Sequence, residues 1–167
     1  MDDSPQQAEW RRWLAEHAPK FLLFARQQAR SEADAQDLVQ EAVVEACQRK
    51  REGQPPAPAL VFAMLRRRAV DLARREDRRT GRELAAAAPA AELWFDTTVE
   101  DRELSHLIHG AMSRLPDIFR DVITLKVWGG LTFTEVADAL GIPANTAASR
   151  YRYGLLELRK LTKEVLA

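Results

Sequence analysis

The sequence lacks the features typical of secreted and membrane-spanning proteins. It has one cysteine in 167 residues, Cys47, which excludes an internal disulfide framework and fits a reducing compartment. Its apolar runs are far shorter than a membrane span, and the acidic Asp2 and Asp3 do not fit the basic start of a secretory leader. We therefore expect a cytoplasmic protein without membrane insertion.

Several sequence patterns are also missing. No segment alternates apolar and polar residues with the period of a half-buried strand, so we predict an all-α fold. No phosphate-binding loop, nucleophile elbow or Ser-His-Asp order is present, so we expect no enzymatic activity and no cofactor. Glu103, His106 and His109 superficially resemble metal ligands, but groups at that spacing drift around a helix. No metal site is predicted.

The formal net charge is zero, but charges of each sign are grouped along the chain. Residues 65–82 contain eight arginines against three acids, a net of +5, and residues 144–163 have a net of +4. Between them, residues 83–106 have a net of −5. Two basic segments separated by an acidic one predict two contact sites for an anionic polymer such as a nucleic acid.

Residues 131–159 have the strongest local pattern, which is two helical segments joined by a turn. Thr132 and Glu135 predict a capping box at the start of the first helix, and Gly141 can end that helix in the left-handed conformation. Pro143 suits the opening of the second helix. The pattern predicts a DNA-binding helix-turn-helix, whose second helix enters the major groove. In that helix we expect Asn145, Ser149 and Arg152 to face outward, and Ala147, Tyr151, Leu155 and Leu158 to be buried.

The first half of the chain also consists of predicted helices. Apolar residues recur at helical spacing through residues 5–50, where Pro19 predicts the first turn of a second helix and Ser31 predicts an N-cap. Residues 53–58 contain three prolines and predict a loop, and residues 60–79 predict an arginine-rich helix.

We predict two small helical domains, residues 5–79 and 99–166, joined by an acidic linker at residues 80–98. Each domain is small enough to be marginally stable alone. Trp94 and Phe95 are unusual for a flexible linker, so we expect this pair to dock on another part of the structure.

Two stretches read together resemble a known family. Residues 34–41 (DAQDLVQE) are similar to region two of bacterial sigma-70 factors, and residues 130–150 (GLTFTEVADALGIPANTAASR) are similar to region four. Two domains and a short linker resemble the extracytoplasmic-function (ECF) class. The resemblance implies a region 2-like bundle and a region 4-like helix-turn-helix, in a factor that binds core RNA polymerase, recognises the −10 and −35 promoter elements and promotes DNA melting.

The resemblance also implies three sets of contact residues in this chain. The set for the core polymerase comprises Asp34, Asp37, Leu38, Gln40 and Glu41. The set for the −10 element and melting comprises Gln54, Arg66, Arg67, Arg68, Arg74, Arg75 and Arg78. The set for the −35 element, on the recognition helix, comprises Asn145, Thr146, Ala148, Ser149, Arg150 and Arg152.

The implied partners are the β′ and β subunits of core polymerase and promoter DNA. Family members are often held inactive by an anti-sigma protein, and the sequence leaves that partner open. Arg67 stands where many members have Asn, so base reading and phosphate binding both stay open for it. Two other interpretations also stay open, namely a stand-alone helix-turn-helix regulator with an N-terminal dimerisation domain, and a helical protein-binding adaptor.

Overall fold

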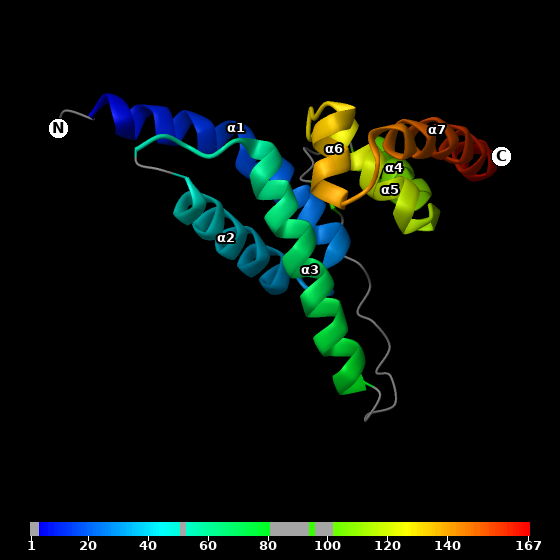
Figure 1. The fold of residues 1–167 in the computed structure, drawn as a ribbon. Helices are drawn as coiled ribbons and strands as arrows, with labels where there is room; N and C mark the ends of the chain where they lie inside the picture. The colour runs from blue at the N-terminus through cyan, green and yellow to red at the C-terminus, as the bar shows by residue number, and fades with distance from the viewer. Residues whose placement is uncertain (1–3, 51–52, 81–93, 96–101) are drawn as a thin grey trace. The chain divides into compact units, whose positions relative to one another are not determined.

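The computed structural model describes residues 4–50, 53–80, 94–95 and 102–167, and all regular elements in these ranges are helical (Figure 1). The predicted all-α fold is confirmed. The chain divides into two compact units, Met1–Ala91 and Glu92–Ala167, called here the N-terminal unit and the C-terminal unit. Most of the predicted acidic linker, residues 81–93 and 96–98, lies outside the described residues.

The described residues of the N-terminal unit form three helices, α1 (Pro5–Gln28), α2 (Glu32–Arg49) and α3 (Pro58–Thr80), each packed against the other two. Its core is an aromatic cluster between α1 and α3. The ring of Phe62 meets the rings of Phe21 and Phe24 edge to face, with centroids 5.0 Å and 5.9 Å apart, and all three residues are buried. Such pairs stabilise a fold beyond the area they bury.

The prediction that Pro19 begins a second helix is wrong, because α1 continues through it. An internal proline removes one backbone hydrogen bond and costs roughly 3 kcal/mol. The rings of Trp13, His17 and Phe21 form an aromatic stripe on α1 that extends past Pro19. The ring of His17 lies 5.4 Å from that of Trp13 and 6.1 Å from that of Phe21. Burial of this stripe on both sides of Pro19 offsets the lost hydrogen bond.

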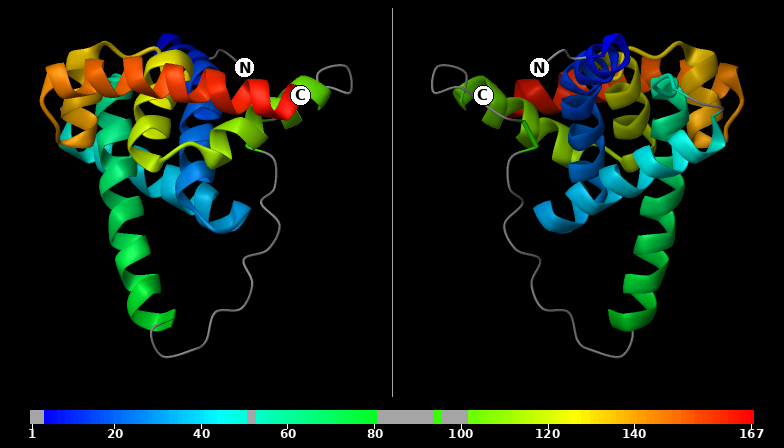
Figure 2. Two further views of the ribbon diagram at one scale, coloured as in Figure 1. Left: turned by 90° about the vertical axis from the view of Figure 1, so that its right-hand side faces the viewer. Right: turned by 90° about the vertical axis from the view of Figure 1, so that its left-hand side faces the viewer.

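Helix α2 begins as predicted, since the Ser31 side chain accepts a hydrogen bond from the Asp34 N–H. The C-terminal half of α3 projects beyond the ends of α1 and α2 (Figures 1 and 2). That half carries exposed arginines instead of core residues. The projecting half is thus mainly charged, and Arg30, between α1 and α2, contacts it through ion pairs with Glu76 and Asp77.

The C-terminal unit contains α4 (Arg102–Arg114), α5 (Asp117–Ile123), the π-helical turn η2 (Thr124–Trp128), α6 (Phe133–Leu140) and α7 (Ala144–Leu166). Helices α4, α5 and α6 all pack on α7. The predicted capping box is confirmed: Thr132 Oγ1 accepts from the Glu135 N–H, and the Thr132 N–H donates to Glu135 Oε2 at 2.7 Å. Gly141 ends α6 with a φ of 66°, so the turn between α6 and α7 is the predicted one.

Of the residues expected on the buried face of α7, Ala147 is buried, and Tyr151 and Leu158 are only half-buried. Leu155 was expected inside but is 39% exposed, whereas Gly154 is buried. A Cβ atom on Gly154 would lie 3.0 Å from Phe119 Cβ and from Ile123 Cδ1, so α7 approaches α5 closely at this glycine. Because glycine has no apolar side chain, the spacing of apolar residues predicts that its neighbour Leu155 is the buried residue.

Trp94 and Phe95 dock on the C-terminal unit, as predicted for this pair. The Trp94 ring lies 4.4 Å from the ring of His109, and the guanidinium of Arg120 lies over it at 5.4 Å. The Phe95 ring contacts Trp128 of η2 at 5.5 Å. These contacts anchor a point of the linker region to α4, α5 and η2.

Across the described residues, we find no helix with the length and apolar character to cross a membrane.

The two helical glycines of the C-terminal unit allow a matched test of this packing. Gly110 in α4 has open space where a Cβ would lie, so Gly110→Ala should raise the free energy of unfolding by roughly 0.5–1 kcal/mol. Gly154→Ala should instead lower it by about 1 kcal/mol, because the crowding against Phe119 exceeds the helix-propensity gain. Urea denaturation of both variants measures the difference, and an equal gain at both positions would contradict the close approach of α7 to α5.

A second test concerns the ion pair between Arg26 and Glu32, which form two hydrogen bonds of 2.8 Å at the junction of α1 and α2. The hydrogen bond from Arg26 holds the pKa of Glu32 below its ordinary value of 4.5. A depressed carboxyl pKa stabilises the fold above the unfolded-state pKa, and this contribution is lost as the pH falls through the folded-state pKa. Glu32→Gln should therefore cost about 1 kcal/mol near neutral pH, and the difference from wild type should shrink as the pH is lowered below 4.5. Denaturation at several pH values, with exposed Glu9→Gln as control, would reject the pairing if the difference stayed constant.

Candidate functional site

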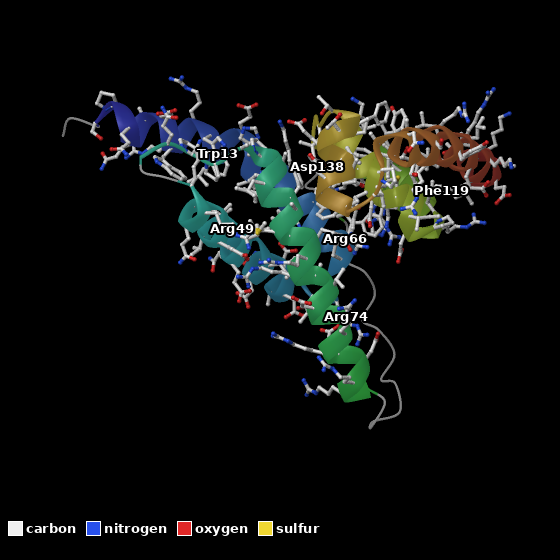
Figure 3. All side chains as sticks on the ribbon, viewed as in Figure 1. Trp13, Arg49, Arg66, Arg74, Phe119 and Asp138 are labelled. Carbon is white, nitrogen blue, oxygen red and sulfur yellow. The ribbon has the colours of Figure 1, made fainter. Side chains whose placement is uncertain are left out.

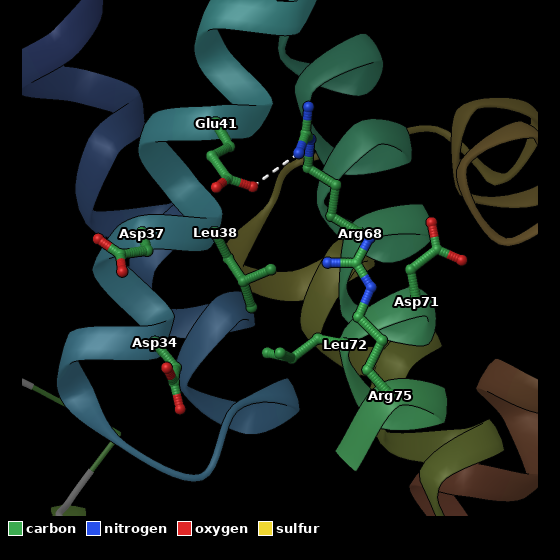
Figure 4. A pocket seen from close by; sticks show the side chains of 8 residues that line it. All are labelled: Asp34, Asp37, Leu38, Glu41, Arg68, Asp71, Leu72 and Arg75. Atoms are coloured by element: carbon green, nitrogen blue, oxygen red, sulfur yellow. Dashed lines mark hydrogen bonds and ion pairs between the residues drawn. The ribbon is translucent and has the colours of Figure 1, made fainter. Parts of the chain in front are cut away.

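Helix α2 presents an acidic face beside α3 (Figure 4). The carboxylates of Asp34, Asp37 and Glu41 lie one helical turn apart and line a pocket of about 180 Å³ between the two helices. Asp71 adds a fourth carboxylate from α3, and Arg68 and Arg75 add two guanidinium groups. The face is therefore strongly charged, and its carboxylates suit a partner that offers basic side chains.

The residues predicted for polymerase contact have different degrees of exposure. Asp37, Gln40 and Glu41 are exposed, and Asp34 is half-buried. Leu38 is only 4% exposed and lies at the pocket between the acidic side chains, together with Leu72 of α3 (Figure 4). The structure thus brings Asp34, Asp37 and Glu41 together around the apolar Leu38, whereas Gln40 is exposed and does not line this pocket.

The arginines predicted for the −10 element fall into two groups along α3. Arg74, Arg75 and Arg78 are exposed on the projecting half, where Figure 3 labels Arg74. With Asp71, these three line an open hollow that is rich in guanidinium groups. A hollow of this composition on a projecting helix can hold phosphate groups from a nucleic-acid backbone.

The second group, Arg66, Arg67 and Arg68, lies nearer the start of α3; Arg66 is half-buried, and Arg67 and Arg68 are held by α2. Arg68 donates to Glu41 at 2.6 Å and to Glu45 at 3.0 Å, Arg67 is hydrogen-bonded to the other oxygen of Glu45, and Arg49 contacts the same carboxylate at 3.0 Å. Glu45 thus accepts from three guanidinium groups on two helices. Burial raises the pKa of Glu45, but the hydrogen bonds from Arg67 and Arg68 outweigh it, so its pKa lies below 4.5.

Glu45 was not among the predicted site residues. The available signal was weak: Glu45 follows Glu41 by four residues, so both carboxylates share one face of α2. Their partners stand 22 and 23 residues later in the chain than Glu45, and no local pattern indicates that pairing. Asp71 and Leu72 were likewise not predicted to line the pocket between the helices.

The loop that carries Gln54 is fixed against α1. The carbonyl of Gly53 accepts hydrogen bonds from Gln6 Nε2 at 2.8 Å and from Trp10 Nε1 at 3.2 Å. Gly53 has a φ of 91°, which disfavours other residues there. Gln54 is exposed beside this anchor, so the fold holds the loop and leaves the amide of Gln54 at the surface.

The second helix of the helix-turn-helix, α7, presents its predicted polar face. Asn145, Ser149 and Arg152 are exposed, and their spacing of four and three residues places them on one side. Asn145 Oδ1 also accepts from the Thr146 N–H at 2.9 Å, at the start of the helix. The guanidinium of Arg152 lies 5.1 Å from the ring of the exposed Tyr153. The remaining predicted residues, Thr146, Ala148 and Arg150, are half-buried.

His109 has a structural contact of its own. Its Nδ1 atom accepts a hydrogen bond of 3.4 Å from the Trp94 N–H, and burial, with a smaller effect of His106, lowers its pKa. No group of three or more His, Cys, Asp or Glu side chains in the described part of the chain is arranged to hold a metal.

Two family models match the chain in the expected order. The model described as Sigma-70 region 2 matches residues 13–79, and the model described as Sigma-70, region 4 matches residues 111–160. Between them they account for well over half of the chain. The first match includes the acidic face of α2 and the arginines of α3, and the second includes α6, the turn and most of α7.

Proteins of similar sequence include the ECF RNA polymerase sigma factor SigK of Mycolicibacterium vanbaalenii, 31% identical over 105 residues that cover 60% of this chain and 53% of that protein. The ECF RNA polymerase sigma factor SigW of Bacillus subtilis is 34% identical over 70 residues, which cover 42% of this chain and 37% of that protein. The chain thus matches about half the length, or less, of these curated relatives.

Two solved structures have a similar fold. One is the sigma factor RpoE in complex with the anti-sigma factor NepR from Bartonella quintana, with a TM-score of 0.67, 21% identity and coverage of 92% of this chain and 96% of that one. The other is CnrH in complex with the cytosolic domain of CnrY, with a TM-score of 0.63, 21% identity and coverage of 96% and 92%. The two matched regions, the similar sequences and the shared fold agree: the chain belongs to the sigma-70 family of RNA polymerase sigma factors, within its ECF class.

Proposed function

We propose that this chain is a sigma factor that binds core RNA polymerase, recognises the −10 and −35 elements of a promoter and promotes DNA melting for transcription initiation. The observation that carries the proposal is the order of surfaces along one chain. An acidic helix face and an arginine-rich helix lie in the region 2 match, and a helix-turn-helix with a polar outer face lies in the region 4 match.

Each surface suits one part of this function. The carboxylates of α2 would meet a basic element of the polymerase β′ subunit, since opposite charges steer and orient an encounter. The exposed arginines of α3 would hold phosphates beside the −10 element. Capture of an unstacked base would offset the few kcal/mol that unstacking costs, so melting would need no nucleotide hydrolysis. The outer face of α7 would read the −35 element in the major groove.

The two other interpretations of the sequence are not favoured. A stand-alone helix-turn-helix regulator or a protein-binding adaptor gives no reason for a region 2 match over residues 13–79. The proposed function places the chain in the cytoplasm with the polymerase, in contact with its β′ and β subunits, and requires no enzymatic activity of the chain itself. One of the similar solved structures contains the anti-sigma factor NepR, which supports the proposal that such a protein controls this chain.

Transcription in vitro tests the polymerase part of the proposal. Core polymerase plus this chain should start RNA at specific promoters of its own genome, and the chain should co-migrate with core enzyme in gel filtration. Asp37→Lys should reduce core binding at least tenfold, about 1.4 kcal/mol, because it places a cation on the exposed acidic face. Glu9→Lys makes the same charge change at an exposed position of α1 and should leave core binding unchanged. No initiation on any promoter, with no co-migration, would refute the proposal.

Recognition of the −35 element is tested on α7. Arg152→Ala should weaken binding of holoenzyme to promoter DNA by about 1–3 kcal/mol if Arg152 contacts a base, and Arg150→Ala should act in the same direction. Lys163→Ala removes an equal charge about 16 Å further along the same helix and serves as control. Mobility-shift titrations on promoters with altered −35 bases separate a base contact, which changes sequence preference, from a phosphate contact. Unchanged affinity in both arginine variants would show that another face of α7 meets DNA.

A further inference from the structure

The pairing of α2 with α3 affects which arginines can reach DNA. Of the six arginines predicted for the −10 element, Arg67 and Arg68 are tied to carboxylates of α2. Arg74 and Arg75, about two turns further along α3, are exposed, and neither guanidinium forms an ion pair among the described residues, although Arg75 lines the pocket beside the carboxylates of α2. Helix α3 therefore has two arginine pairs of equal charge, of which one forms ion pairs with α2 and the other does not.

Glu45 is at the centre of the tied pair. Its side chain is only 13% exposed, and its two carboxylate oxygens accept from Arg67, Arg68 and Arg49. Charge-assisted hydrogen bonds of this kind are about twice as strong as neutral ones, and the low exposure of Glu45 reduces screening by salt. A guanidinium held in this way has its charge locally balanced and part of its hydrogen-bonding fork in use.

We propose that Glu45 is a positioning residue that holds Arg67 and Arg68 on α2 in the free chain and so withholds both from DNA phosphates. Contact with DNA before polymerase is bound would then be limited to the remaining arginines of α3 and to the C-terminal unit. The inference rests on the proposed function, because it takes α3 to be a DNA-contacting helix. It adds that the number of phosphate contacts is set by a carboxylate on a neighbouring helix.

The charge balance of the cluster supports this assignment. Glu41 and Glu45 together carry two negative charges, and they contact the guanidinium groups of Arg49, Arg67 and Arg68. The cluster therefore has a net charge of only +1, although it contains three arginines. A phosphate that approached Arg67 or Arg68 would meet the Glu45 carboxylate beside it, and like charges would repel.

The test measures binding of the full free chain to a random-sequence DNA duplex as a function of salt. Each phosphate contact adds about 0.9 to the slope of log affinity against log salt. Arg74→Gln/Arg75→Gln should make the slope shallower by about 1–2, whereas Arg67→Gln/Arg68→Gln, with the same charge change, should leave it unchanged. Equal losses in the two double variants would overturn the role of Glu45 but leave DNA binding by α3 standing. An unchanged slope in both would overturn this inference together with the −10 contact of the proposed function.

A variant that frees Arg67 and Arg68 from Glu45 should change the salt slope in the opposite direction. Glu45→Gln should steepen the slope by about 1–2, so that affinity between 50 and 200 mM salt falls by roughly a further 4- to 16-fold relative to wild type. Glu9→Gln, the matched control on α1, should not change the slope, and adding Arg67→Gln/Arg68→Gln to Glu45→Gln should abolish the gain. A purely structural role for Glu45 would lower thermal stability without this change of slope, and that outcome would overturn the proposal. If Glu45→Gln does not fold, as judged by circular dichroism, the comparison of the two double variants decides alone.

Discussion

The packing of α2 against α3 is the constraint on which the candidate interfaces of the N-terminal unit depend. Both helices bury apolar residues in a shared core with α1, and this leaves their charged residues at the edge of the contact. The acidic pocket and the arginine cluster are two parts of that edge. Because Arg68 contacts both Glu41 and Glu45, the surface proposed for polymerase and the surface proposed for DNA share a side chain. Neither surface can be described by the residues of one helix.

In the C-terminal unit, the packing of uncharged residues determines which side chains are exposed. Its polar outer face on α7 is set by what the opposite face buries, and that face includes Gly154, where α7 approaches α5. The Gly141 turn and the Thr132 capping box fix where α6 ends and begins. Exposure of Asn145, Ser149 and Arg152 on a single side is thus a result of backbone geometry and close packing, and it requires no pairing between charges.

The features that were readable from the sequence are those with a local physical cause. The Ser31 cap, the Thr132 box and the Gly141 turn involve residues at most four apart, and their backbone consequences are the same in any helical protein. Pro19 was misread because the aromatic rings that carry the helix across it are stabilised by Phe62, 43 positions later in the chain. Gly154 was missed because its contribution is the space that it leaves. In both cases tertiary packing overrode a local preference.

The sequence predicted least well which arginines have their charge balanced by neighbouring carboxylates. A count over residues 65–82 gives a net of +5 and treats every arginine as equally available to an anion. In the folded chain, Glu45 and Glu41 from another helix balance part of that charge, while Arg74 and Arg75 remain on the projecting half of α3. The electrostatic surface of a helix therefore includes the carboxylates that packing brings beside it. For the proposed contacts with DNA phosphates, that difference would determine how many of the arginines a nucleic acid encounters.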